Sequence, residues 1–239
     1  MKHIITAAAM FCMASAVLGQ SLPQTVPDGK RLALGQYCYT MSTTKNGTST
    51  PVGVTFQSIA REQANGVDAL AVVVHQHMFD GKFDLRDSFL LRHDNMRPIR
   101  LDTDRDGKPH VHLEYSNRHI SGWKLQGGAK QPIEVELSAP VWDGNLWGLT
   151  FAALPLTTGT HLTLPTYQYD SGFGSFYVDV VDQHQESTPA GMVQAWRIQA
   201  GIERSEMVDY TVSTKPGLEI AYHAGPYTQR LGGDCSQIE

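Results

Sequence analysis

Apolar and polar residues alternate along most of this chain from about residue 30 onwards. In one such run, Ile133, Val135 and Leu137 alternate with Glu134 and Glu136. Successive side chains of a strand point to opposite faces, so this pattern predicts a strand with one buried and one solvated face. The same alternation recurs in further runs: Val111–Tyr115, Phe176–Val180, Val208–Val212 and Leu218–Tyr222.

Short turn motifs separate the alternating runs. They are Asn46-Gly47, Asn65-Gly66, Asp80-Gly81, Asp106-Gly107, Gly127-Gly128 and Pro216-Gly217. Such pairs favour tight turns between antiparallel strands. The spacing predicts about ten to thirteen strands in an all-β protein, built as a single curved antiparallel sheet or open barrel. The chain shows no strong internal repeat, so we expect a single β-rich domain over residues 20–239.

One segment, Leu146–Leu154, departs from the alternation. It is apolar on nearly every side, which predicts a short helix that is buried or lines a cavity. Asp143 is expected to cap this helix and Pro155 to end it. Gly148 weakens it by about 1 kcal/mol relative to Ala.

The first nineteen residues have the layout of a secretory signal peptide. Lys2 supplies positive charge, Ile4–Leu18 is an uncharged apolar run, and Val17 and Gly19 suit the −3 and −1 positions of a cleavage site. The run is too short for an ordinary membrane span. We therefore expect residues 1–19 to be a cleaved leader and the protein to reach the periplasm or the outside of the cell.

Charge and hydropathy exclude two classes of partner. The net charge is −5, and removal of Lys2 with the leader makes it one unit more negative. A mildly acidic chain without a basic stripe argues against binding to nucleic acid or to anionic lipid headgroups. No later stretch reaches the roughly eighteen apolar residues of a membrane span, so we expect the protein not to span a membrane.

Two cysteines remain after the leader, which contains Cys12. In an oxidising compartment Cys38 and Cys235 predict one disulfide, with two unrelated buried thiols as the alternative. In the chain-entropy model, closing so long a loop lowers the entropy of the unfolded state, which stabilises the folded state by on the order of 5 kcal/mol.

The histidine pairs are the sharpest metal candidates. Alternation in a strand places His110, His112 and Glu114 on one face, and imidazole with carboxylate suits zinc, iron or manganese. His75 and His77 form a second pair, and the four imidazoles would converge if the two strands were neighbours. Solvated strand faces also carry His, so we predict no cofactor and keep metal binding as the weaker alternative.

An Asp run precedes the first histidine pair. Asp102, Asp104, Asp106 and Gly107 begin like a calcium loop, but Leu113 stands where the closing Glu is required. The calcium-loop pattern therefore fails, and an Asp-Gly hairpin turn explains the run. Similarly, Asp80, Asp84 and Asp87 are better explained by salt-linked turns than by acid–base catalysis.

Aromatic residues gather around the predicted helix. The candidates for ligand binding are Trp142, Trp147, Phe151, Tyr167, Tyr169 and Phe176. Beside an apolar helix they would line a cavity for an apolar ligand, or they would fill an ordinary β core. The motifs of the common hydrolases, metalloproteases and nucleotide-binding proteins are absent, so we assign no catalytic residue.

The segment Trp142–Gly159, above all Leu154–Gly159, resembles an exported bacterial family known as domain of unknown function 3108. The block Phe176–Trp196, with Pro189-Ala190-Gly191, is similar in rhythm to the same family. The resemblance covers residues 30–225. It implies a curved antiparallel sheet related to the LolA-like periplasmic lipoprotein carriers, and it carries no catalytic residues.

These observations favour a non-enzymatic binding or carrier protein for an apolar or amphiphilic ligand such as a lipid. Two alternatives remain open. One is an envelope-associated enzyme, either metal-dependent or directed at glycans, and the other is a structural assembly partner of the cell envelope. The ligand and the oligomeric state are not encoded in any of these patterns.

Overall fold

The computed structural model describes residues 26–238. The predicted leader and Cys12 lie outside these residues, so the leader and the single domain over residues 20–239 stay predictions. None of the helices in the described part of the chain is long and apolar enough to cross a membrane.

The described chain consists mainly of strands. They are β1 (Gly35–Lys45), β2 (Thr48–Ala64), β3 (Val67–Met78), β4 (Asp84–Arg92), β5 (Pro98–Arg105), β6 (Lys108–Tyr115), β7 (His119–Gln126), β8 (Ala129–Glu136), β9 (Trp142–Asp143), β10 (His161–Gln168), β11 (Gly172–Thr188), β12 (Gly191–Gly201), β13 (Val208–Ser213), β14 (Glu219–Ala224) and β15 (Tyr227–Leu231). Two short helices accompany them: the 3-10 helix η1 (Gly29–Arg31) and the α-helix α1 (Gly148–Ala152).

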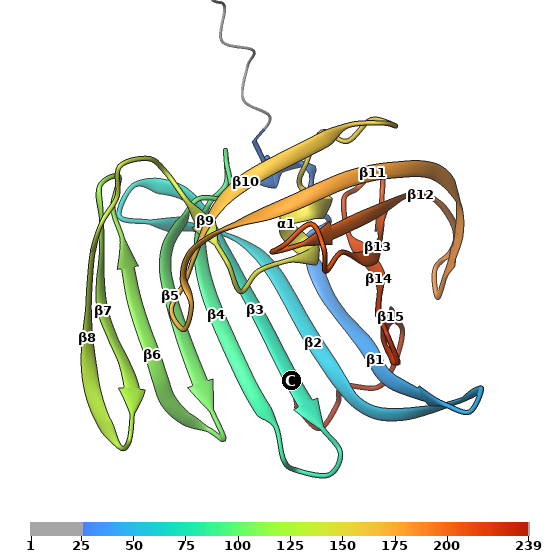
Figure 1. Ribbon diagram of the computed structural model, residues 1–239, viewed down its shortest axis with the longest axis horizontal. Coiled ribbons are helices and arrows are strands. Elements are labelled where there is room, and N and C mark those ends of the chain that lie inside the picture. Colours follow the sequence, from blue (N-terminus) through green and yellow to red (C-terminus); the bar gives the residue numbers. More distant parts are fainter. Residues whose placement is uncertain (1–25, 239) are drawn as a thin grey trace, which may run out of the picture.

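All fifteen strands belong to one sheet, in the order β8-β7-β6-β5-β4-β3-β2-β1-β15-β14-β13-β12-β11-β10-β9. The pair β9 and β10 is parallel, and the other neighbours are antiparallel. The sheet curls so that its N-terminal strands face its C-terminal strands, with α1 between them (Figure 1). The predicted single curved sheet or open barrel with one short apolar helix is therefore confirmed. The estimate of about ten to thirteen strands is too low.

The predicted turn motifs all lie between consecutive strands. Asn46, Asn65 and Asp106 have φ angles of 52°, 50° and 52°. Asn and Asp tolerate this left-handed conformation better than most residues, and the Gly that follows each of them accepts it freely. Local backbone preference therefore fixes these hairpins, including the Asp-Gly turn in the run that resembles a calcium loop.

Alternate residues of the strands form one continuous hydrophobic core inside the curl. Members of the predicted runs lie in it, among them Leu113, Ile133, Val178 and Val212. Each fully buried aliphatic side chain stabilises the fold by roughly 1.5–3 kcal/mol relative to an exposed one. Burial of the inner face thus holds the curled sheet together.

Helix α1 is shorter than the predicted segment Leu146–Leu154. Trp147 occupies the N-cap position and makes no side-chain capping hydrogen bond, so the prediction that Asp143 caps the helix is wrong. Asp143 Oδ1 instead accepts hydrogen bonds from the backbone N–H of Asn145 at 2.8 Å and from its side-chain amide at 3.0 Å. This Asx turn competes with capping for the carboxylate. All residues of α1 are buried, as predicted.

Cys38 and Cys235 form the predicted disulfide, with their Cα atoms 5.7 Å apart. The segment after β15 then lies against β2 and β3. Cys235 packs on Val54 and Phe56 of β2, and the carbonyl oxygen of Ile238 lies 2.8 Å from Nδ1 of His75. The disulfide thereby attaches the end of the chain to its first strands.

Candidate functional site

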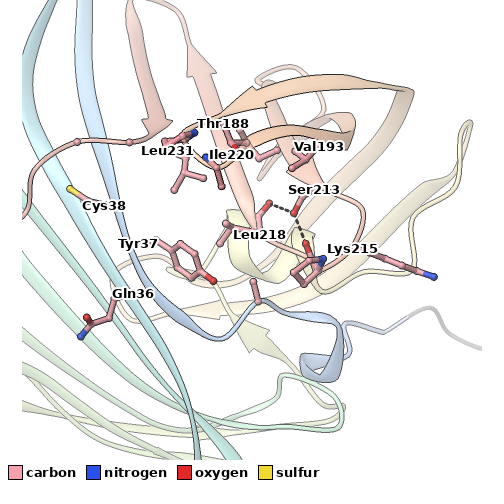
Figure 2. A pocket seen from close by; sticks show the side chains of 16 residues that line it. Gln36, Tyr37, Cys38, Thr188, Val193, Ser213, Lys215, Leu218, Ile220 and Leu231 are labelled. Carbon is pink, nitrogen blue, oxygen red and sulfur yellow. Dashed lines mark hydrogen bonds between the residues drawn. The ribbon is translucent and has the colours of Figure 1, made fainter.

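An outer pocket of about 400 Å³ lies between β1, β14, β15 and the turn that joins β11 to β12. Tyr37, Val193 and Ile220 surround it, while Lys215 points away (Figure 2). The Ser213 hydroxyl, which also borders it, donates to a backbone carbonyl of its own loop at 2.5 Å. The pocket would accept an apolar group, but its described lining residues include no buried charge that would select one ligand over another.

A second cavity, of about 490 Å³, lies inside the curl of the sheet. Side chains from β2, β3, β4, β10, β13, β14 and β15 line it together with the start of α1. Ile202 and Glu206, which belong to the loop between β12 and β13, also line the cavity and are exposed. This loop therefore lies at the mouth, and the volume falls in the usual range of small-molecule sites.

Five buried polar side chains cross the lining of this interior cavity, and we call them the polar belt: Thr55, Gln57, Asp87, Glu219 and Gln229. Thr55 Oγ1 donates to Gln229 Oε1 at 2.6 Å, and Gln229 Nε2 donates to Glu219 Oε1 at 2.9 Å. The Tyr39 hydroxyl lies 3.2 Å from Gln57 Oε1 and 3.0 Å from the carbonyl oxygen of Glu219. Buried polar groups normally have such partners, and unpaired ones are unusual.

Glu219 is the most deeply buried acid of the belt. Its Oε1 accepts the bond from Gln229, whereas no residue among 26–238 donates to its Oε2. Burial raises the pKa of Glu219 to about 7, against the opposing effect of the Gln229 hydrogen bond. Removal from water disfavours the charged carboxylate, so near neutral pH this group exchanges readily between its two protonation states.

A β-bulge determines the direction of Glu219. The register between β13 and β14 pairs Thr211 with Ala221 and Val212 with Glu219, which leaves Ile220 as an extra residue. Such a bulge reverses the alternation of faces, and Glu219 lines the cavity together with Tyr222. The predicted common face of Leu218–Tyr222 is therefore interrupted within β14.

Asp87 on β4 is the second buried acid with an available oxygen. Its Oδ1 accepts a hydrogen bond from Thr103 Oγ1 at 2.6 Å, and no described residue donates to Oδ2. Burial raises the pKa of Asp87 to about 7, and the charge of Asp143 acts in the same direction. The Thr103 hydrogen bond and the charge of Arg105 oppose this rise. Like Glu219, Asp87 offers the cavity a buried carboxyl oxygen.

Asp143 has a structural role beside the cavity. Burial raises its pKa, while hydrogen bonds from Tyr115 and Asn145 oppose the rise. The Tyr115 hydroxyl donates to Asp143 Oδ2 at 2.7 Å. Asn145, which is held by Asp143, accepts a hydrogen bond from Gln168 Nε2 at 3.0 Å, and Asn145 and Gln168 both line the cavity.

Aromatic rings form one wall of the interior cavity. Trp147, Tyr210 and Tyr222 line it, and the rings of Tyr210 and Tyr222 stack with centroids 5.5 Å apart. Burial and then the charge of Glu219 raise the pKa of both tyrosines. This coupling indicates that the aromatic wall and the Glu219 carboxyl are close together.

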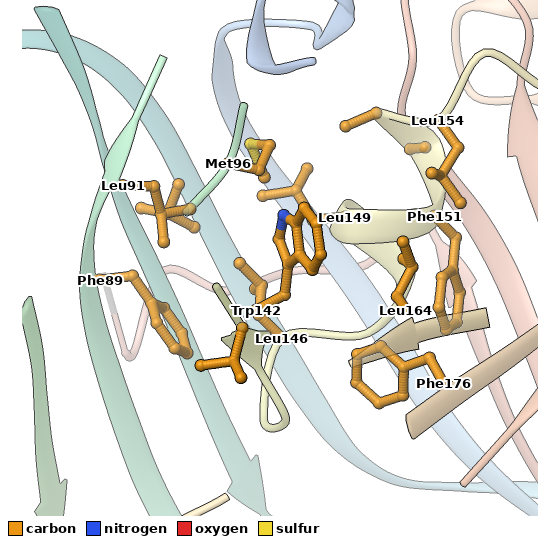
Figure 3. Close-up of a cluster of buried hydrophobic side chains, with 14 of the residues drawn as sticks. Phe89, Leu91, Met96, Trp142, Leu146, Leu149, Phe151, Leu154, Leu164 and Phe176 are labelled. Atoms are coloured by element: carbon orange, nitrogen blue, oxygen red, sulfur yellow. The ribbon is translucent and has the colours of Figure 1, made fainter. Parts of the chain in front are cut away.

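Trp147 is the predicted aromatic residue that lines the cavity. Its ring lies 4.7 Å from that of Phe176, centroid to centroid. Phe151 is fully buried, and Figure 3 shows it beside Phe176, with ring centroids 5.3 Å apart. Its ring centroid lies 5.1 Å from that of Tyr210. Phe151 and Phe176 therefore support the aromatic wall from behind.

The other three predicted aromatic residues lie elsewhere in the structure. Trp142 is 1% exposed, and its Nε1 donates to the carbonyl oxygen of Asn95 at 2.9 Å. Tyr167 is buried next to Phe173, with ring centroids 5.6 Å apart. The backbone carbonyl oxygen of Tyr169 accepts a hydrogen bond from Lys124 Nζ on β7 at 3.3 Å. A role of these three in ligand binding stays a prediction.

The two histidine pairs do not converge. Their strands, β3 and β6, are separated in the sheet by β4 and β5. His75 and His77 share one carboxylate, that of Asp84, at 3.0 Å and 2.7 Å. Within residues 26–238, no cluster of three or more His, Cys, Asp or Glu side chains is arranged to hold a metal ion.

The pair on β6 is also divided locally. The register between β5 and β6 skips His110, which marks a bulge. His112 Nδ1 lies 2.6 Å from Asp102 Oδ1, whereas the ring of His110 lies edge-on to Tyr169 with centroids 6.3 Å apart. The bulge separates His110 from the other two residues, whereas His112 Nε2 and Glu114 Oε1 lie 3.8 Å apart on a common face. The shared face expected for all three residues is therefore wrong for His110.

Comparison with known proteins agrees with this architecture. A crystal structure of a β-barrel-like protein of domain of unknown function DUF1849 from Brucella abortus superposes with a TM-score of 0.50 at 8% sequence identity. The match covers 87% of this chain and 95% of that chain, and at this identity it shows the fold alone. No curated protein matches the sequence.

The sequence itself matches a family model, that of the proteins of unknown function DUF3108, over residues 38–220. The match includes most of the strands and the residues of the polar belt up to Glu219. It confirms the resemblance to this family, whereas the expected likeness to LolA-like carriers stays a prediction. The chain belongs to the DUF3108 family.

Proposed function

We propose that this protein is an exported, non-enzymatic binding or carrier protein for an amphiphilic small molecule, with the interior cavity as its binding site. The observation that carries the proposal is the composition of that cavity. Apolar side chains of α1 and β13 face the same space as two buried carboxyls that each have one oxygen without a donor among the described residues. An apolar body with a polar end complements both parts.

Export is supported by two independent features. The apolar leader of residues 1–19 has the layout of a secretory signal. The disulfide between Cys38 and Cys235 suits an oxidising compartment such as the periplasm. The apolar part of an amphiphile in that compartment has to be shielded from water, and a cavity of this kind can shield it.

One observation favours the enzymatic alternative. Asp87 and Glu219 both have a pKa raised by burial to about 7, and perturbed carboxyls are common in glycan-cleaving active sites. They stand on β4 and β14, with β3, β2, β1 and β15 between them in the sheet. Release of reducing sugar from envelope glycans, abolished by Glu219→Gln, would support the enzyme instead.

The test of the binding proposal uses the full-length exported protein. Native mass spectrometry and solvent extraction of protein purified from the envelope should reveal a copurifying amphiphile. A fluorescent lipid probe should bind with a stoichiometry of about one, and Trp147→Ala should weaken that binding. Pro189→Ala, at the outer pocket, serves as the matched control and should leave it unchanged. Probe binding that is lost only in the outer-pocket variant would contradict the choice of site.

A further inference from the structure

The charged residues that line the interior cavity are all acidic in the described part of the chain. Three acids line it, Asp87, Glu206 and Glu219, whereas no Lys, Arg or His is found among its described lining residues. Arg105 acts on Asp87 through space, but the two form no ion pair among the described contacts. The cavity therefore presents negative charge when these acids are ionised, and the pKa values of Asp87 and Glu219, both about 7, make them partly ionised near neutral pH.

Glu219 provides a specific anchoring point within this field. The residue is 6% exposed. Gln229 holds its Oε1, and Oε2 has no donor among residues 26–238. A carboxyl oxygen that has no donor in the protein depends on water or a ligand in the cavity for its hydrogen bonds. A ligand that donates a charge-assisted hydrogen bond would satisfy it.

The surroundings of Glu219 suit a cation in particular. Tyr210 and Tyr222 lie close enough for the carboxylate charge to raise their pKa, and Trp147 lines the same cavity. The faces of Trp and Tyr rings attract ammonium groups, most strongly where water is excluded. A buried carboxylate framed by aromatic rings is thus complementary to an ammonium ion.

We propose that the interior cavity selects a cationic amphiphile, whose ammonium head lies against Glu219 and the tyrosine part of the aromatic wall, Tyr210 and Tyr222, while its alkyl chain packs on Leu146, Trp147 and Leu149. This inference rests on the proposed function and names its ligand class. An anionic amphiphile would meet like charges from three acids. A neutral one would make hydrogen bonds with the polar belt but would leave the charge of Glu219 uncompensated.

The test compares amphiphiles that share one alkyl chain and differ in the head. Wild-type protein is titrated calorimetrically with dodecylammonium, dodecyl maltoside and dodecanoate below their micelle concentrations, and with butylammonium as the same cationic head without a long chain. The titrations are run at physiological salt, which screens surface charges but leaves a buried pair of ligand cation and carboxylate largely intact. The cationic long-chain probe should bind at least about tenfold more tightly than each of the others.

Glu219→Gln then tests the anchoring residue, since the amide keeps the size of the side chain and an acceptor for Gln229. This variant should reduce the affinity for dodecylammonium about tenfold and leave the affinity for dodecyl maltoside unchanged. Glu203→Gln, an exposed position of the neighbouring loop, is the matched control and should change neither. Thermal unfolding of each variant verifies that it is folded.

The possible outcomes separate the two proposals. Equal affinity for all heads, or a cationic preference that survives Glu219→Gln, overturns the inference and leaves the binding function intact. Tight binding of butylammonium alone overturns the amphiphilic part of the inference. Absence of binding for every probe overturns the inference together with the proposed function.

Discussion

Gly148 leaves the space that the Glu219 carboxyl occupies, because a Cβ atom at position 148 would overlap that carboxyl. Gly148 is the first residue of α1, and Glu219 belongs to β14 on the facing part of the sheet. The residue that weakens the helix locally is therefore the residue that lets a buried acid reach the cavity. Position 148 therefore carries a residue of low helix propensity because the polar belt needs the space that a side chain would fill.

Gly148→Ala should destabilise the protein although Ala favours helix by about 1 kcal/mol. The added methyl group forces Glu219 or α1 to shift, and such overpacking typically costs about 1–3 kcal/mol. Urea unfolding would measure the loss. In a Glu219→Ala background the same substitution should be neutral or stabilising, and equal losses in both backgrounds would show that the two positions are not coupled.

Glu219→Gln should stabilise the protein at high pH. The folded-state pKa of Glu219, about 7, lies above its ordinary value. The neutral form is therefore favoured in the folded state, and the associated stability is present at low pH and is lost as the pH rises through 7. The glutamine variant avoids this loss, so it should exceed wild type by on the order of 2–3 kcal/mol at pH 8.

The stability gap between Glu219→Gln and wild type should shrink towards zero near pH 4. Urea unfolding at both pH values measures it, with Glu203→Gln as the exposed control. Asp87→Asn should behave in the same direction, since burial also raises the pKa of Asp87 to about 7. A glutamine variant that is less stable than wild type at pH 8 would mean that the folded protein stabilises the ionised carboxylate.

The regular part of the fold is encoded locally, which is why it can be read from the sequence. Alternation marks the strands, and Asn-Gly or Asp-Gly pairs adopt the left-handed conformations that tight hairpins need. The helix is recognisable by its apolar residues, but its ends are not. Asp143 is of a residue type that commonly caps helices, but it forms an Asx turn with Asn145 instead. The sequence does not decide between a capping bond and an Asx-turn bond.

The candidate site depends on features that lie outside local patterns. The bulge at Ile220 turns Glu219 to the inside of the sheet, and a bulge has no distinct sequence signature. Asp87 is different, because it stands in phase with Phe89 and Leu91, which are both buried. The alternation therefore indicated that Asp87 is buried, and the interpretation of Asp80, Asp84 and Asp87 as salt-linked turns overlooked this. For Asp80 that interpretation holds, because Asp80 pairs with Lys82 at 2.9 Å.

Removal of the disulfide should loosen the end of the chain and lower global stability. In the chain-entropy model a loop of this length contributes on the order of 5 kcal/mol, so the double variant Cys38→Ser/Cys235→Ser should lose several kcal/mol in urea unfolding. Wild type under reducing conditions should match it. An unchanged midpoint would show that packing of Cys235 on Val54 and Phe56, rather than the covalent bond, holds the segment.

Trp147 and Phe151 should respond differently to truncation, because one lines the cavity and the other supports it. Phe151 is fully buried between Phe176 and Tyr210, so Phe151→Ala should cost about 3–5 kcal/mol of unfolding free energy. Trp147→Ala should cost less, because one side of its ring faces the cavity, and it should weaken binding of a fluorescent lipid probe more strongly relative to its stability loss. Parallel urea unfolding and probe titration of both variants measure the two effects. If Phe151→Ala weakens binding and leaves stability nearly unchanged, the cavity extends to Phe151, and the six aromatic residues around α1 form a larger ligand site than Trp147 alone provides.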